Sequence, residues 1–178
     1  MTDGELFHVI ETAFRGVKLD GGISLRQGEI CDNFGKDNEG KEVSEREFAA
    51  IPRTEITDDW SAIPLEELER YPYLAHLDPK GFRYYIPALL LSLLQNSDAG
   101  SMRVISTFSA LRAGGQFWQH DMERYQTLSP TQRVAVATFL SHLQNDARID
   151  PENQRLVARA VKAYWHQYLP SPGESGRP

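Results

Sequence analysis

Three stretches in the second half of the chain have the pattern of a helix start. DPKG (78–81), SPTQ (129–132) and DPEN (150–153) each place an oxygen-bearing side chain before a proline. Such a side chain accepts hydrogen bonds from the free N–H groups of a first helical turn, where proline needs no N–H. Because a helix-compatible run follows each stretch, we predict helices over 79–95 and from residues 130 and 151 onward.

Apolar residues elsewhere in the chain also repeat at helical spacing. They predict helices over residues 5–17, 24–35, 44–51, 64–70 and 101–111, with a short helix after the glycine break at 114–115. Ser24 and Ser44 open two of these helices with capping-box spacing. Phe34 and Ile105 are expected on the apolar faces of their helices.

The segment RTEITDDWSAIP (53–64) fits no regular element: its β-branched residues could form a short strand, but no second strand is evident to pair with it. We expect it to be extended and anchored by Ile56, Trp60 and Ile63. The predicted fold is all-α: a compact multi-helix bundle with the acidic stretch 36–63 packed on its surface. Residues 1–169 are expected to form a single domain, and residues 170–178 a disordered tail.

The most apolar run, GFRYYIPALLLSLL (81–94), contains an interior proline. Pro87 removes one helical hydrogen bond and crowds the carbonyl of Arg83, at a cost of about 3 kcal/mol. We predict a central helix bent near Pro87, with Arg83, Tyr84 and Tyr85 beside the bend. The Arg83 guanidinium and the two tyrosine hydroxyls either reach hydrogen-bonding partners at the rim of the core or surround a ligand pocket.

Charge is distributed unevenly along the chain. The net charge is −6, yet residues 37–70 hold eleven acidic and four basic residues, while residues 71–178 have a balance of +3. Overall acidity disfavours nucleic-acid binding, because phosphates would be repelled. The acidic segment either lies against the chain's own basic helices or faces a cationic partner. The last helix carries a basic face, which indicates a solvated surface or an anion-binding strip: Arg155, Arg159, Lys162 and His166.

The sequence shows no signature of catalysis, and we predict no metal and no cofactor. Its five histidines match no zinc spacing, and no glycine-rich phosphate loop occurs. Cys31, the single cysteine, excludes an internal disulfide and has no assigned base beside it. Asp58 and Asp59 are adjacent carboxylates, but neighbouring residues point in different directions. One of them capping a turn beside a buried Trp60 is therefore favoured over acid–base chemistry.

The start of the chain lacks a basic segment followed by an apolar one, so no signal peptide is indicated. The longest apolar run is far below the roughly 20 residues of a membrane span. We therefore expect a soluble, cytoplasmic protein.

Four stretches, RQGEICDNFG, TDDWSAIP, LDPKGFRYYIPALL and SMRVISTFSAL, together resemble a family of small, mostly bacterial proteins of unknown function. Its members share a D-D-W-x-x-I-P segment followed by an F-R-Y-Y-x-P-A helix. The positions matching these motifs are Asp58, Asp59, Trp60, Ile63, Pro64, Phe82, Arg83, Tyr84, Tyr85, Pro87 and Ala88. The resemblance covers roughly residues 8–168. It implies a shared fold and assigns no catalytic residue.

Two functional hypotheses follow. The first is a non-enzymatic interaction protein, like immunity or adaptor proteins, that binds a cationic protein through acidic residues such as Glu66, Glu67 and Glu69. The alternative is a small-ligand-binding protein or enzyme with a site at the bent helix. That site would combine Asp58, Asp59 and Trp60 with Arg83, Tyr84 and Tyr85.

Overall fold

The computed structural model describes residues 1–51, 58–95, 101–144 and 146–169. These residues form nine α-helices and four short 3-10 helices, labelled η. The elements are α1 (Asp3–Phe14), α2 (Leu25–Asp32), α3 (Glu45–Ala50), η1 (Trp60–Ala62), α4 (Leu65–Arg70), η2 (Leu74–His76), α5 (Pro79–Gln95), α6 (Met102–Leu111), η3 (Gly115–Phe117), α7 (Trp118–Gln126), α8 (Pro130–Leu143), α9 (Pro151–Ala163) and η4 (Trp165–Tyr168). The predicted all-α fold is confirmed.

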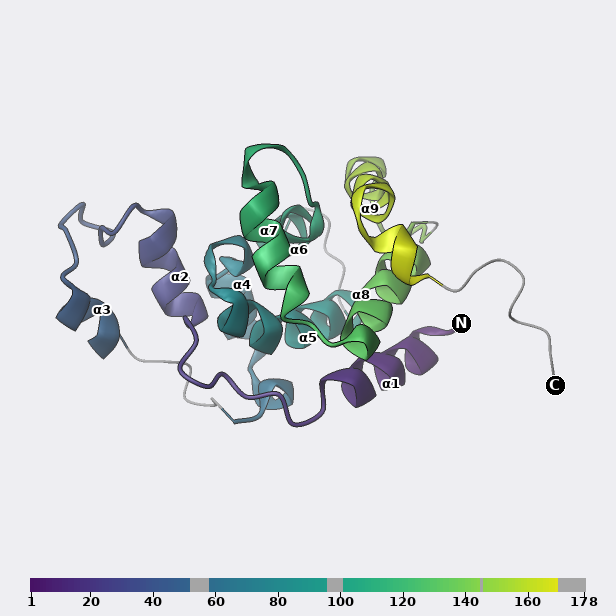
Figure 1. Ribbon diagram of the computed structural model, residues 1–178, viewed down its shortest axis with the longest axis horizontal. Coiled ribbons are helices and arrows are strands. Elements are labelled where there is room, and N and C mark those ends of the chain that lie inside the picture. The colour runs from purple at the N-terminus through teal and green to yellow at the C-terminus, as the bar shows by residue number, and fades with distance from the viewer. Residues whose placement is uncertain (52–57, 96–100, 145, 170–178) are drawn as a thin grey trace.

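Helix α5 runs through the middle of the molecule, and the other helices gather around it (Figure 1). It contacts α1, α6, α7, η1 and η2. The first and the eighth helix lie side by side although they are far apart in the sequence, and α9 packs against both α6 and α8. Helices α2 and α3 form one end of the molecule, at the left of Figure 1, with α3 outermost. None of the helices in the described parts of the chain is long and apolar enough to cross a membrane.

The apolar sequence of α5 is explained by its surroundings. Every residue from Gly81 to Leu94 is buried except Arg83. A helix that is apolar on all sides needs neighbours on all sides, and α5 has them. These contacts offset the cost of the interior Pro87, through which α5 continues as one helix.

The three predicted helix starts are present with their caps. The side chain of Ser129 forms a reciprocal capping box with Gln132 at the start of α8. The Asp150 carboxylate accepts the N–H groups of Glu152 and Asn153 at the start of α9. At α5, Asp78 Oδ1 accepts the N–H of Gly81 at 2.9 Å.

Asp78 also joins the helix to a distant segment, because the same Oδ1 accepts the N–H of Ile23 at 2.7 Å. The loop before α2 therefore crosses α5 at very short range. A Cβ atom added to Gly81 would lie 2.2 Å from the carbonyl oxygen of Ile23, and one added to Gly22 would lie 2.6 Å from the nitrogen of Gly81. Only glycine at both positions permits this crossing.

The structure corrects several details of the sequence analysis. Phe34 is 95% exposed instead of facing the core, and Ile105 is 37% exposed on α6. Residues 60–62 form a 3-10 turn where we expected extended chain. The first helix ends at Phe14, three residues before the predicted end. The expected anchor Ile56 and the predicted disordered tail 170–178 lie outside the described residues.

Candidate functional site

The DDW segment is joined to the bundle by its tryptophan and by a tyrosine of α5. Trp60 is 4% exposed, and its Nε1–H donates to the carbonyl of Phe14 at 2.8 Å. Burial raises the pKa of Tyr84, and the neighbouring Tyr85 and the charges of Asp59 and Asp58 raise it further. A hydrogen bond from the backbone of Asp59 lowers the pKa of Tyr84 and offsets part of this rise. Tyr84 therefore reaches the segment from inside the core.

The two carboxylates of this segment have separate local partners. Asp59 caps η1, accepting the N–H of Ser61 at 3.0 Å and its hydroxyl at 2.6 Å. Asp58 is exposed and lies 3.6 Å from the ammonium group of Lys18. In the described part of the chain, neither carboxylate forms an ion pair with Arg83.

Tyr84 and Tyr85 are fully buried and pack edge to face, with ring centroids 4.9 Å apart. Their rings lie in the core, while the Tyr84 hydroxyl reaches the backbone of Asp59. A ligand could reach these rings only if the core opened, so the arrangement lends no support to a ligand site at this point of α5.

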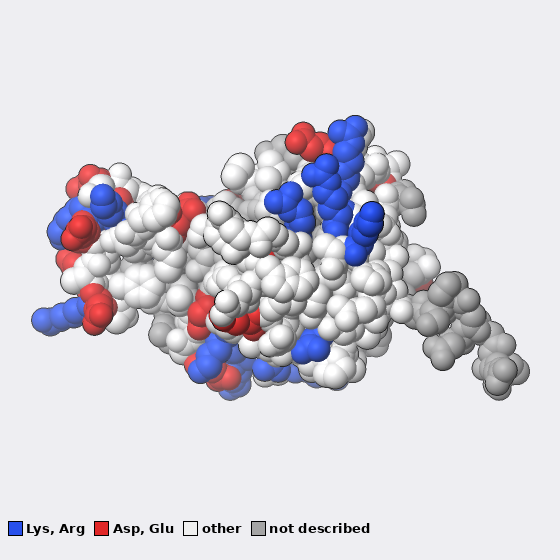
Figure 2. Space-filling model, turned by 45° about the horizontal axis from the view of Figure 1, so that its top comes forward, with Lys and Arg blue, Asp and Glu red and all other residues white. Residues whose placement is uncertain are grey.

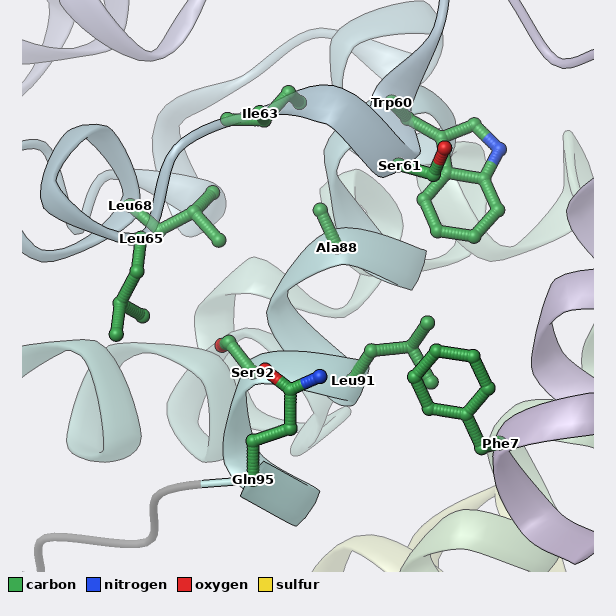
Figure 3. A pocket seen from close by; sticks show the side chains of 10 residues that line it. All are labelled: Phe7, Trp60, Ser61, Ile63, Leu65, Leu68, Ala88, Leu91, Ser92 and Gln95. Atoms are coloured by element: carbon green, nitrogen blue, oxygen red, sulfur yellow. The ribbon is translucent and has the colours of Figure 1, made fainter. Parts of the chain in front are cut away.

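A small pocket lies beside this segment, between α1, η1, α4 and α5 (Figure 3). Its volume is about 150 Å³, below the roughly 300 Å³ of the smallest typical ligand pockets. The hydroxyl of Ser92, one of its few polar groups, donates to the Leu89 carbonyl and accepts from Nη1 of Arg103, both at 2.7 Å. The small volume and the engaged Ser92 hydroxyl give no support to a ligand site in this pocket.

The acidic residues of α4 are largely engaged within the molecule. Arg26 of α2 holds Glu67 with two hydrogen bonds of 2.7 and 3.0 Å. Glu69 lies 3.8 Å from the guanidinium of Arg103, which is completely buried. Glu66 is exposed. Two of the three acidic side chains that we expected to contact a partner, Glu67 and Glu69, thus form ion pairs with arginines of α2 and α6.

The end of α2 presents a feature that the sequence did not reveal. Phe34 has a positive φ of +54°, and its side chain is 95% exposed. The N–H of Gly35 bonds to the carbonyl of Ile30 at 2.9 Å, which closes the helix in a Schellman motif. The left-handed position of such a motif usually holds glycine, and another residue there costs about 1–2 kcal/mol.

Phe34 belongs to the arm, by which we mean residues 25–51: α2, α3 and the connection between them. The arm encloses an apolar groove of about 330 Å³, lined by Ile30, Cys31, Gly35, Val43, Glu45 and Phe48. Helix α3 has no buried residue. It is held to α2 by a bond from the Gln27 side chain to the Phe48 carbonyl, 3.0 Å long. All lining residues except Ile30 are half-buried or exposed, so solvent reaches the groove.

The groove has no reactive nucleophile. Burial raises the pKa of the Cys31 thiol, and the negative charge of Asp78 raises it further. A thiol with a raised pKa is neutral near pH 7, and only the thiolate is a good nucleophile. Cys31 therefore lines the groove as a small apolar side chain.

The surroundings of the groove are acidic. The arm carries seven acidic and four basic residues, a net charge of −3, and charged side chains surround its outer end (Figure 2, left). Hydrogen bonds from Ser44, together with Lys41 at 3.0 Å, lower the pKa of Glu47 to about 2. Glu42 and Glu45 are exposed nearby. The groove thus has an apolar lining and acidic residues around it, and the exposed Phe34 directly precedes its lining residue Gly35 in the chain.

Two further polar clusters contain histidine, and in the second Arg148 bridges Asp3 and Asp146 as well. His76 lies 3.0 Å from Asp32, and His142 lies 2.7 Å from Asp3. Among the described residues, no group of three or more His, Cys, Asp or Glu side chains is placed to hold a metal ion.

These features define an all-α protein with an open, acid-bordered apolar groove at one end. The chain belongs to a family of unknown function, DUF6714, whose model matches residues 2–169. The family resemblance inferred from the motifs is thereby confirmed. No curated protein and no solved structure matches the chain.

Proposed function

We propose that this protein is a non-enzymatic interaction protein, of the kind to which immunity and adaptor proteins belong, and that its arm binds a cationic protein partner. Phe34 is the observation that carries this proposal. An aromatic ring with 95% exposure contributes little to the core, and its left-handed backbone costs the folded state energy. Large aromatic side chains are typical anchors of protein interfaces. A binding role accounts for a phenylalanine where glycine would be more stable.

The groove and its charges suggest the chemistry of the partner. An apolar side chain of the partner would enter between Ile30 and Phe48, while Phe34 packs on the partner's surface. Lys or Arg side chains around that apolar residue would meet the acidic border, which includes Glu42 and Glu45. Complementary charge of this kind accelerates encounter and disfavours acidic competitors.

We place the acidic binding surface on the arm, whereas the sequence-based hypothesis placed it on residues of α4. Glu67 and Glu69 face Arg26 and Arg103, so a partner would have to compete with partly buried intramolecular pairs. Glu66 is exposed and stays a candidate for a peripheral contact.

The central experiment compares variants of the arm with matched variants elsewhere. Partners captured from the native host by the wild-type protein are purified, and their affinities are measured by calorimetry. Phe34→Ala should weaken binding by about 2 kcal/mol or more, roughly thirtyfold in Kd. Phe117→Ala is the matched control, because Phe117 is a 62% exposed phenylalanine outside the arm.

A second comparison tests the charge. Glu42→Lys should weaken binding and reduce its salt dependence, whereas Glu123→Lys, an exposed glutamate of α7, should leave both unchanged. If the captured partner binds Phe34→Ala as tightly as the wild type, or if Glu42→Lys has no effect, the arm is not the interface.

The strained backbone supplies an independent test. Phe34→Gly should raise the free energy of unfolding by about 1 kcal/mol while it abolishes partner binding, since glycine relieves the left-handed conformation and removes the ring. A loss of stability in this variant would show that Phe34 is retained for the fold and not for a partner.

A further inference from the structure

A second pocket lies away from the arm, between η2, the end of α6 and the start of α7. It has a volume of about 480 Å³, within the usual range of small-molecule sites. His76 reaches it from η2, Arg112 and Phe117 from the α6–α7 connection, and His120 from α7. It shares no residue with the groove of the arm.

An ion pair fixes one wall of this pocket. The side chain of Arg124 is 2% exposed, and its Nη2 donates to Asp121 Oδ1 at 2.5 Å. Its Nη1 donates to the carbonyl of Ala75 at 2.7 Å, which ties η2 to α7. The remaining nitrogen, Nε, is buried and has no hydrogen-bond partner within the described part of the chain. Arg124 is thus held in place by these two bonds and by the Phe82 ring, 5.3 Å below its guanidinium, and it shapes the wall of the pocket.

The charges at this pocket favour an anion. Asp121 balances Arg124, whereas Arg112 is exposed and forms no ion pair with any described residue. Nε2 of His120 lies 3.4 Å from the Ala75 carbonyl, and Nε2 of His76 lies 3.0 Å from Asp32. Two arginines and one aspartate therefore line the pocket, and guanidinium groups pair well with phosphate and carboxylate.

Helix α9, which packs against α6, adds to this positive field. Its residues Arg155, Arg159 and Lys162 are exposed, and basic side chains gather over this helix in Figure 2.

Phe117 supplies a contact of a different kind. It is 62% exposed and ends η3, which forms part of the pocket wall. An exposed aromatic face beside a guanidinium favours a ligand that joins a flat ring to an anionic group, because each part finds its own partner.

We infer that this pocket binds a small organic anion that carries a flat ring, a molecule of the size of a nucleoside monophosphate. Arg112 pairs with the phosphate or carboxylate, the imidazoles of His76 and His120 contribute hydrogen bonds, and Phe117 stacks on the ring. The site is independent of the protein partner proposed for the arm.

Calorimetry with four probes tests this inference in low-salt buffer: AMP, adenosine, inorganic phosphate and benzoate. AMP should bind at least about tenfold more tightly than adenosine or phosphate, because each fragment lacks one of the two contacts. Benzoate distinguishes a carboxylate-bearing ligand from a phosphate-bearing one. If neither AMP nor benzoate binds at millimolar concentration, or if adenosine or phosphate alone matches AMP, the inference is overturned.

Two variants test whether the ligand binds in this pocket and not elsewhere on the protein. Arg112→Gln should weaken the binding of AMP or benzoate about tenfold or more, and Phe117→Ala about fivefold or more. Arg15→Gln is the control, since Arg15 and Arg112 are both exposed C-cap residues and the charge change is the same. An equal loss in Arg15→Gln would reveal a general charge effect and overturn the assignment.

Discussion

The crossing of the 20–23 loop over α5 gives the sharpest prediction about stability. Gly81→Ala places a Cβ atom 2.2 Å from the carbonyl oxygen of Ile23 and 3.0 Å from Asp78 Oδ1. The first contact is with backbone, which cannot turn away as a flexible side chain can. The loop must therefore separate from the first turn of α5. The bond from the Ile23 N–H to Asp78, now 2.7 Å long, is lost or stretched with it.

The expected loss can be assembled from its parts. Overpacking of this kind costs about 1–3 kcal/mol. The hydrogen bond from Ile23 to Asp78 contributes about 1 kcal/mol, and alanine returns about 1 kcal/mol through its higher helix propensity. We therefore expect Gly81→Ala to lower the free energy of unfolding by about 1–3 kcal/mol.

Urea denaturation followed by circular dichroism measures this loss, and Gly4→Ala is the matched control. Gly4 lies in α1, and a Cβ atom there would meet nothing within 4 Å. That variant should gain about 0.5–1 kcal/mol from helix propensity alone. A Gly81→Ala protein within about 0.5 kcal/mol of the wild type would refute the reasoning, because ordinary surface substitutions fall in that range.

Two further predictions concern contacts that hold the first helix. Hydrogen bonds from Arg148 and His142 lower the pKa of Asp3 below 3.8, so its stabilisation is present above that pH and is lost as the pH falls through the lowered value. Asp3→Asn should therefore be less stable than the wild type in urea at neutral pH, and the difference should shrink as the acidified wild type protonates Asp3; a difference that stays constant into acid would contradict this account. Trp60→Phe removes the indole donor to Phe14 and should cost about 1–2 kcal/mol in the same assay, whereas an unchanged midpoint would show that this bond contributes nothing.

Local signals in the sequence predicted most of the helices. Ser24, Ser44, Ser129 and Asp150 each bond to a backbone N–H two or three residues further on, so their caps depend on a few neighbouring residues. The burial of α5 could also be predicted from the sequence, because a helix with apolar residues on every side must be surrounded by other elements.

The candidate sites were much less predictable. Phe34 stands before a glycine at the end of an apolar pattern, and nothing local distinguishes it from a core residue. Arg103 shows the opposite behaviour, because this charged residue is completely buried, with Ser92 and Glu69 near its guanidinium. Both outcomes depend on where other helices end and pack, which the pattern along one helix does not contain.

The sequence alone determined the helical class, the helix starts and the family, because each rests on residues within a few positions of one another. Only the tertiary structure decided which polar groups remain available to bind a ligand or a partner. It paired Arg26 with Glu67 across 41 positions, placed Gly22 against Gly81, and left the groove of the arm and the Arg112 pocket open. Such contacts arise when distant segments share space in the folded chain. The exposed ring of Phe34 and the unpaired charge of Arg112 could therefore be identified as candidates for binding only from the folded structure.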